Sequence, residues 1–397
     1  MNRVQDDPYA KKILQGEECF QMGRIDDALE AFESVLKKDS HHCEALNNKA
    51  ALLNKLGETD EATRIFLKIL QIQPGHPDGI FNLVSNYLSQ SNWQMAEDVF
   101  SLYANSLPME DAEALARDIV DFKFTLSEES NMLKSFPLTV NVNSKTHTLR
   151  LFLDTHKYSQ KIMWDYLANG RTYEPETLEF LASVLKEGDC FIDIGAHIGY
   201  FTLMASKMVG PQGTVISVEP EISNTAHLGK HLSENDIENV VLINAAVGSE
   251  TRNTAFYINS DNDGGHALWD SAINPLCEKT RQTGVVREVR MLTLDDIIRQ
   301  ANIDSVNAIK IDTEGAEKNV LEGGIQSLMT YDIPYIVCEI NRFGLHQMGT
   351  NEKEFRDFMK DLGYDTYLMR TQNPHLTKLQ PDQYVQSKYV FNVLFMK

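Results

Sequence analysis

CFIDIGAHIGYFT, at Cys190–Thr202, is the stretch around which the larger part of this chain is predicted to fold. A short apolar run ends in Asp193, and Gly195 and Gly199 then lead into the helical pattern FTLMASKM. The stretch therefore predicts a strand, a tight turn and the start of a helix. Glycine lets backbone in such a turn approach a ligand closely, because it has no Cβ. The spacing Gly-x-x-x-Gly does not match the dinucleotide fingerprint Gly-x-Gly-x-x-Gly.

Strands and helices are predicted to alternate from this stretch onward, which indicates a parallel sheet covered on both faces. The predicted strands are Phe191–Asp193, Thr214–Glu219, Val240–Ala245, Ala308–Asp312 and Tyr335–Glu339. Two further segments, Thr366–Met369 and Tyr389–Met396, are expected to form an antiparallel pair at the sheet edge. Ligands of such sheets bind at the carboxyl ends of the strands, where Glu219 can accept hydrogen bonds from ribose hydroxyls.

Six sequence motifs occur in a characteristic order. They are YEPE (Tyr173–Glu176), DIGAHIGYFT, VISVEPE, NAAVGS (Asn244–Ser249), TLDD (Thr293–Asp296) and IKIDTEGAEKNVLEGG (Ile309–Gly324). In this order they resemble the FkbM family of S-adenosylmethionine-dependent methyltransferases. Two departures are His197, where the family usually has Asn, and Thr313, where it usually has Val. The resemblance implies a Rossmann-like class I methyltransferase of the α/β class, with a mostly parallel sheet and one antiparallel edge strand.

The same resemblance implies S-adenosylmethionine as the cofactor and a hydroxyl-bearing small molecule or glycan as the acceptor. Asp193 would orient the glycine turn that lines the methionine part, Glu219 would hold the ribose, and Asn244 or Ala246 would meet the adenine. The full set of implied cofactor-binding residues is Asp193, Gly195, Ala196, His197, Gly199, Glu219, Pro220, Asn244 and Ala246. N-methylation stays open, since an amine can attack before it loses its proton.

Asp312 and Glu314, in IDTEGAE, are the predicted catalytic residues. Either carboxylate can act as general base if it lies within hydrogen-bond reach of the acceptor hydroxyl. The alternative for Asp312 is a structural role as the cap of the following helix. A magnesium site that adds Glu339 is chemically suitable, but the spacing does not establish it and no metal is predicted. His266 lies in a predicted loop or lid at Asn259–Arg287, and simple exposure is the favoured interpretation.

The N-terminal part repeats with a period of 34 residues and resembles the tetratricopeptide repeat, a pair of antiparallel helices. The repeated columns are Ala28/Ala62/Ala96, Phe32/Phe66/Phe100 and Gly23/Gly57/Ser91. A capping helix is expected at Met109–Phe124. The expected domains are helical repeats at 1–126, a connecting hairpin and helix at 127–170, and the methyltransferase domain at 171–397. The repeats could bind a protein or peptide partner.

Composition restricts the partners and the compartment. The formal net charge of −20 disfavours nucleic acid and anionic membrane surfaces as partners. The sequence shows no secretory signal and no apolar stretch of about 18 residues, so a cytoplasmic location is expected. The five cysteines form no Cys-x-x-Cys motif, which indicates neither a disulfide framework nor a zinc site.

Two other classes of function remain open at this point. The chain could be an interaction scaffold whose second domain binds cofactor but turns over slowly. It could also bind another nucleotide, as an oxidoreductase does, although the missing dinucleotide fingerprint disfavours this.

Overall fold

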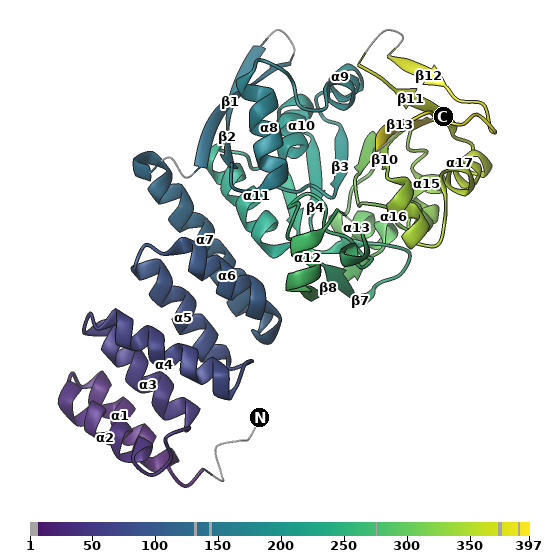
Figure 1. Cartoon of the computed structure of the whole chain (residues 1–397). Coiled ribbons are helices and arrows are strands. Elements are labelled where there is room, and N and C mark those ends of the chain that lie inside the picture. The colour runs from purple at the N-terminus through teal and green to yellow at the C-terminus, as the bar shows by residue number, and fades with distance from the viewer. Residues whose placement is uncertain (1–6, 131–132, 143–144, 275, 372–374, 388–389) are drawn as a thin grey trace. The chain divides into compact units, whose positions relative to one another are not determined.

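The computed structural model describes residues 7–130, 133–142, 145–274, 276–371, 375–387 and 390–397. The chain divides into two compact units, Met1–Lys123 and Phe124–Lys397 (Figure 1). The division falls inside helix α7, Met109–Ser130, shortly before the expected boundary at 126. In the described part of the chain, no helix is both long enough and apolar enough to span a bilayer.

The first unit consists of paired helices, as the 34-residue repeat predicts. They are α1 (Ala10–Gln21), α2 (Ile25–Leu36), α3 (Cys43–Lys55), α4 (Thr59–Ile72), α5 (Pro77–Ser89) and α6 (Trp93–Tyr103), followed by the short η1 (Ala104–Ser106) and α7. The alanine and phenylalanine columns are buried, with exposed fractions of 2% or less. The turn column is left-handed in all three repeats, with φ of 74° at Gly23, 86° at Gly57 and 58° at Ser91. The tetratricopeptide-type architecture is confirmed.

Two histidines of the first unit begin helices. The ring of His42 accepts a hydrogen bond from the Ala45 amide at the start of α3, and His76 accepts one from the Gly79 amide at the start of α5. His42 also lies 3.2 Å from Asp7. His41 is exposed, whereas His42 is partly buried.

The second unit contains an eight-stranded sheet in the order β12-β11-β13-β10-β9-β3-β4-β5. Its strands are β3 (Cys190–Ile194), β4 (Thr214–Val218), β5 (Val240–Ile243), β9 (Ala308–Ile311), β10 (Tyr335–Ile340), β11 (Asp365–Met369), β12 (Leu376–Lys378) and β13 (Phe391–Met396). From β10 to β5 all neighbours are parallel. This confirms the predicted α/β class.

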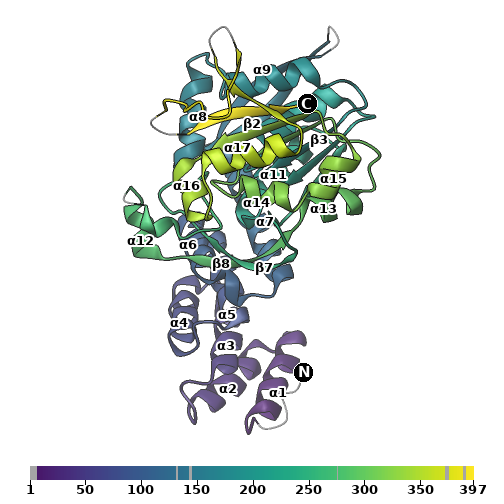
Figure 2. The same cartoon turned by 90° about the vertical axis from the view of Figure 1, so that its right-hand side faces the viewer.

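Alternate residues of the central strand pack on different layers. Ile192 and Ile194 belong to one core, whereas Phe191 belongs to the other. Helices cover both faces (Figures 1 and 2). They are α8 (Tyr158–Ala168), α9 (Pro175–Val184), α10 (Tyr200–Val209), α11 (Ile222–Glu234), α13 (Leu294–Ala301), α14 (Glu317–Glu322), α15 (Ile325–Thr330), α16 (Arg342–Gln347) and α17 (Glu352–Asp361).

The expected antiparallel pairing of the two C-terminal segments is confirmed by β11 and β13, but the expected position of the reversed strand at the sheet edge needs correction. Strand β13 is antiparallel, but it lies inside the sheet between β10 and β11. The reversed strand at the edge is the short β12, which pairs with β11. The reason is burial: Val393, Leu394 and Phe395 are 0% exposed, so both faces of β13 and both of its edges are covered. Tyr389, the expected first residue of this strand, lies outside the described residues.

Two smaller sheets accompany the main one. β1 (Leu133–Val142) and β2 (Lys145–Asp154) pair as an antiparallel hairpin, where alternation predicts one between 138 and 153. Its predicted Asn143-Ser144 turn lies outside the described residues. The sheet β6-β8-β7 was not predicted; it comprises β6 (Ala246–Val247), β7 (Arg252–Tyr257) and β8 (Val286–Leu292). The segment between β7 and β8, which includes η2 (Ser271–Ile273) and α12 (Glu278–Thr283), is the predicted loop.

Candidate active site

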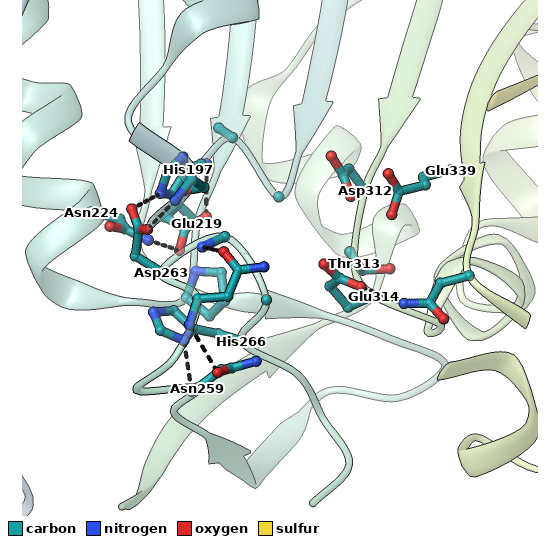
Figure 3. A pocket seen from close by; sticks show the side chains of 18 of the residues that line it. His197, Glu219, Asn224, Asn259, Asp263, His266, Asp312, Thr313, Glu314 and Glu339 are labelled. Atoms are coloured by element: carbon teal, nitrogen blue, oxygen red, sulfur yellow. Dashed lines mark hydrogen bonds and ion pairs between the residues drawn. The ribbon is translucent and has the colours of Figure 1, made fainter. Parts of the chain in front are cut away.

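A cavity of about 720 Å³ lies at the carboxyl ends of β3, β4, β9 and β10. Its volume is within the usual range of small-molecule sites. The predicted residues that line it are Gly195, Ala196, His197, Glu219, Pro220, Ala246, Asp312 and Glu314. Figure 3 shows two groups of polar side chains on opposite sides of this cavity. One surrounds Glu219 and the other surrounds Asp312.

Glu219 follows β4 and is held by the turn that follows β3. Its Oε2 accepts a hydrogen bond of 2.9 Å from the His197 amide. Its Oε1 accepts bonds from the Glu221 amide at 3.0 Å and from the Asn224 side chain at 3.3 Å. Burial raises the pKa of the Glu219 carboxyl. The two turns that end neighbouring strands are thus joined by a carboxylate that faces the cavity.

His197 connects this turn to the loop between β7 and β8. Its backbone is left-handed, with φ of 50°, a conformation that is unusual for a residue other than glycine. Its Nε2 lies 3.1 Å from Oδ2 of Asp263, which belongs to that loop. Burial opposes protonation of His197, but the hydrogen bond and charge of Asp263 outweigh it and raise the pKa of the ring. The contact with Asp263 therefore favours the protonated ring and holds the two side chains together.

Close packing, and not only the approach of a ligand, requires glycine at position 195. It is left-handed with φ of 76°, and a Cβ at this position would lie 1.8 Å from the carbonyl oxygen of Asp312. The missing side chain therefore makes room for the end of β9. This packing brings the turn after β3 against the residue that the sequence predicts as a catalytic base.

The opposite wall of the cavity is strongly acidic. Asp312 Oδ2 lies 3.0 Å from Nζ of Lys310, a buried cation whose pKa is raised by the neighbouring acids against the effect of burial. Burial and the charge of Asp312 raise the pKa of Glu314 to about 8. The same two causes raise the pKa of Glu339 well above its ordinary value. At neutral pH, Glu314 is therefore mainly protonated, and the environment of Glu339 favours its protonated form.

The capping alternative for Asp312 is not what the structure shows. The amides of Thr313 and Gly315 donate to Oε1 of Glu317, the first residue of α14. Asp312 instead contacts Lys310, and its carboxylate faces the cavity. The buried Glu317 thus accepts the hydrogen bonds of the turn amides. The Asp312 carboxylate is therefore not used to cap the helix.

Glu174 is a site residue that sequence reasoning missed. It lines the cavity and has φ of 43°, and its Oε2 accepts a 3.2 Å bond from Asn392. Burial raises its pKa to about 7. Its membership of the YEPE motif was the available signal. Only the fold brings the C-terminal Asn392 to it.

Three predicted cofactor residues lie behind the cavity instead of lining it. Asp193 is buried, and its Oδ2 accepts a 2.7 Å bond from Thr202. A Cβ on Gly199 would lie 2.1 Å from Leu228. The side-chain amide of Asn244 donates to the backbone carbonyl oxygens of Glu219 and Pro220. These contacts support the turns that face the cavity.

The loop between β7 and β8 contributes one wall of the cavity. His266 lines it and accepts a 2.9 Å bond from the Asn259 amide through Nδ1. The residue is only partly exposed, so the interpretation of His266 as an exposed side chain is wrong, and burial lowers the pKa of its ring to about 4. His346, by contrast, is exposed. Within the described ranges, no three His, Cys, Asp or Glu side chains are grouped to hold a metal ion, and this includes Asp312, Glu314 and Glu339.

The sheet order, the helices on both faces and the position of the cavity define the second unit as a Rossmann-like class I methyltransferase fold. Residues 193–366 match the family model described as the methyltransferase FkbM domain, and residues 20–78 match a tetratricopeptide repeat model. The chain therefore carries an FkbM methyltransferase domain preceded by tetratricopeptide repeats. S-adenosylmethionine is the cofactor of this methyltransferase family.

Several known proteins are similar to parts of the chain. "Methyltransferase 1" of Beauveria bassiana is 27% identical over 147 residues, which cover 34% of this chain and 58% of that protein. A methyltransferase structure from Streptococcus mutans in complex with SAH is 14% identical and covers 55% of this chain and 94% of its own, with a TM-score of 0.33. The TPR2B domain of yeast Sti1 in a pHsp70 complex is 18% identical and covers 30% of this chain and 97% of its own, with a TM-score of 0.25.

Proposed function

We propose that this protein transfers a methyl group from S-adenosylmethionine to a hydroxyl of a sugar, glycan or natural-product acceptor. One observation carries the proposal. A single cavity places Glu219 and the glycine turn on one side and the carboxylate of Asp312 on the other. A nucleoside site and a proton acceptor therefore face the same space.

The residues around Glu219 fit the cofactor. An ionised carboxylate has about four acceptor positions, and three protein donors occupy three of them. One position stays available for a ribose hydroxyl. The cofactor-binding residues in this proposal are Gly195, Ala196, His197, Glu219, Pro220 and Ala246, supported from behind by Asp193, Gly199 and Asn244. When bound, the cofactor supplies an electrophilic methyl group on a positively charged sulfur.

The acidic wall divides its roles according to protonation. Asp312, beside Lys310, would accept the proton of the acceptor hydroxyl. Glu314, whose raised pKa keeps it mainly protonated at neutral pH, donates a hydrogen bond to an acceptor oxygen, and Glu339 beside it helps to hold the hydroxyl in line.

The first test is calorimetric titration with S-adenosylhomocysteine. The unmodified chain should bind it saturably, and Glu219→Ala should weaken binding by about tenfold to a hundredfold, through the loss of a charge-assisted hydrogen bond. Glu187→Ala, which changes an exposed carboxylate, is the matched control. If the unmodified chain does not bind, the methyltransferase proposal fails.

The second test distinguishes the acceptor atom. Matched sugars that carry a hydroxyl, an amine or a carboxylate at one position are offered with S-adenosylmethionine, and methylated product is detected by mass spectrometry. Hydroxyl methylation that Asp312→Asn abolishes supports the proposal. Methylation of the amine alone would replace O-methylation by N-methylation.

We assign the helical repeats a docking role for a protein or peptide partner. Repeats of this type have the capacity for such interactions, which is what the match at residues 20–78 supports. A pull-down with the full chain would test this role. A partner that is captured should no longer be captured once the segment of that partner that binds the repeats is deleted.

A further inference from the structure

Asp263 completes helix α8 from a distant part of the sequence. The N-cap residue of α8, Lys157, makes no side-chain capping bond, and Oδ1 of Asp263 accepts a 2.7 Å bond from the Ser159 amide in the first turn. Oδ2 accepts a 3.1 Å bond from the Gln160 side chain. A carboxylate at a helix N-terminus also interacts favourably with the helix dipole. The same Oδ2 contacts His197, so one side chain connects the loop to α8 and to the turn after β3.

Trp269 makes the corresponding contact on the other side of the cavity. Its Nε1 donates a 2.7 Å bond to the carbonyl oxygen of Glu314. Its ring packs against Phe343 of α16 with 5.4 Å between the centroids, and the side chain is 9% exposed. Trp269 thus connects the loop to the turn after β9.

Bonds within the loop make residues 258–267 a compact unit. Tyr257 and Ala267 exchange backbone hydrogen bonds, at 2.8 and 3.2 Å. The side chain of Asn259 accepts from the amides of Asp261 and Asn262, both at 3.0 Å. A segment braced in this way moves as one piece, because displacing either end breaks several bonds together.

Asp263 contacts the side chain of His197 and Trp269 contacts the backbone of Glu314, and these two residues share an unusual backbone conformation. His197 has φ of 50° and Glu314 has φ of 56°, and each follows a strand whose end forms the cavity. Left-handed backbone at a residue other than glycine is unfavourable and persists only where surrounding contacts hold it. Asp263 supplies such a contact to one turn and Trp269 to the other.

We propose that residues 258–270 form a strap across the cavity, and that Asp263 and Trp269 are positioning residues that couple the cofactor turn to the acceptor turn. Asp263 holds the turn of His197, and Trp269 holds the turn of Glu314. Release of either contact loosens both turns, because the braced loop transmits the displacement. The part of this inference that concerns ligands depends on the proposed function, whereas the coupling itself is a property of the chain alone.

Hydrogen exchange of the full chain without ligand tests the coupling. The variants are Asp263→Asn, which replaces an acceptor by a donor opposite His197 and Gln160, and Trp269→Phe, which removes the indole donor and part of the ring system but keeps an aromatic ring. Glu278→Gln, an acid-to-amide change at an exposed position of α12, is the matched control. Each variant should speed exchange about tenfold in peptides covering 193–199 and in peptides covering 313–317, the scale expected for the loss of one buried hydrogen bond. The control should change neither.

Two results would overturn the inference. One is that both variants exchange at the same rate as the control in both groups of peptides. The other is a response confined to 193–199 in Asp263→Asn and to 313–317 in Trp269→Phe, which would show two independent contacts. If one variant fails to fold, the other still reports on the distant turn. Dissociation of S-adenosylhomocysteine should also be about tenfold faster in both variants. Absence of binding by the unmodified chain would contradict the proposed function and leave the exchange result unaffected.

Discussion

Gly195 and Asp312 are in direct backbone contact, so closely that a Cβ on Gly195 would lie 1.8 Å from the Asp312 carbonyl oxygen. The turn after β3 and the end of β9 are therefore packed as one surface. The two sides of the cavity cannot shift apart or together without disturbing this contact.

Gly195→Ala should destabilise the second unit by roughly 2–4 kcal/mol, because it combines a left-handed backbone with a backbone clash. Gly170→Ala is the control, since Gly170 also has positive φ but a Cβ there would meet nothing within 4 Å. That change should amount to only about 1 kcal/mol. Urea unfolding measures both. Equal effects of the two substitutions would show that the contact with Asp312 relaxes easily.

Glu314→Gln should change how stability depends on pH. The pKa of Glu314 is raised to about 8 in the folded chain, so between about pH 4.5 and 8 the folded state binds more protons than the unfolded state. Stability from this group therefore falls as pH rises, by on the order of 1 kcal/mol per pH unit. In the variant, the difference between the unfolding free energies at pH 5 and pH 7 should lack the contribution of Glu314. Glu187→Gln should keep the original slope.

His231→Gln should reduce the sensitivity to acid. The buried ring lies 2.8 Å from the Ile198 carbonyl oxygen and 2.9 Å from the Phe152 amide, and burial lowers its pKa to about 4. Between pH 6.5 and 4 the unfolded state binds more protons, so stability falls as pH falls, by about 3 kcal/mol in total. Unfolding free energies measured from pH 7 to pH 4.5 should show a shallower decline in the variant. The exposed His346→Gln should leave the decline unchanged.

Ser91→Gly should stabilise the third helical repeat. Ser91 has φ of 58° in the column where the first two repeats have glycine, and replacing it should contribute about 0.5–1 kcal/mol. The reverse change, Gly57→Ser, should have the opposite sign, since a Cβ on Gly57 would meet no atom within 4 Å and only the backbone conformation changes. Hydrogen exchange of the helices that flank each turn measures the local stability. The same sign for both substitutions would contradict this explanation.

The order of elements and the ends of the central strands could be predicted from local sequence. The 34-residue columns predict the helix pairs, and the alternation after Cys190 predicts the parallel strands, because both signals lie within one or two neighbouring elements. Gly195, Glu219 and Asp312 were placed at strand ends correctly, since the carboxyl ends of parallel strands share one edge of the sheet.

Contacts between distant segments could not be predicted from local sequence. The internal position of β13 depends on which strands it can pair with and on the burial of both its faces. The pairing of His197 with Asp263 and of Glu174 with Asn392 joins residues that no local pattern connects.

The sequence by itself determined the two kinds of architecture, the helical repeats and the α/β sheet, because periodicity and strand-end residues are local properties of the chain. The tertiary structure alone decided which acids have raised pKa values, why Gly195 must be glycine and where the loop of Asp263 and Trp269 attaches. Burial, close backbone contact and long-range hydrogen bonds arise only when distant segments are packed together.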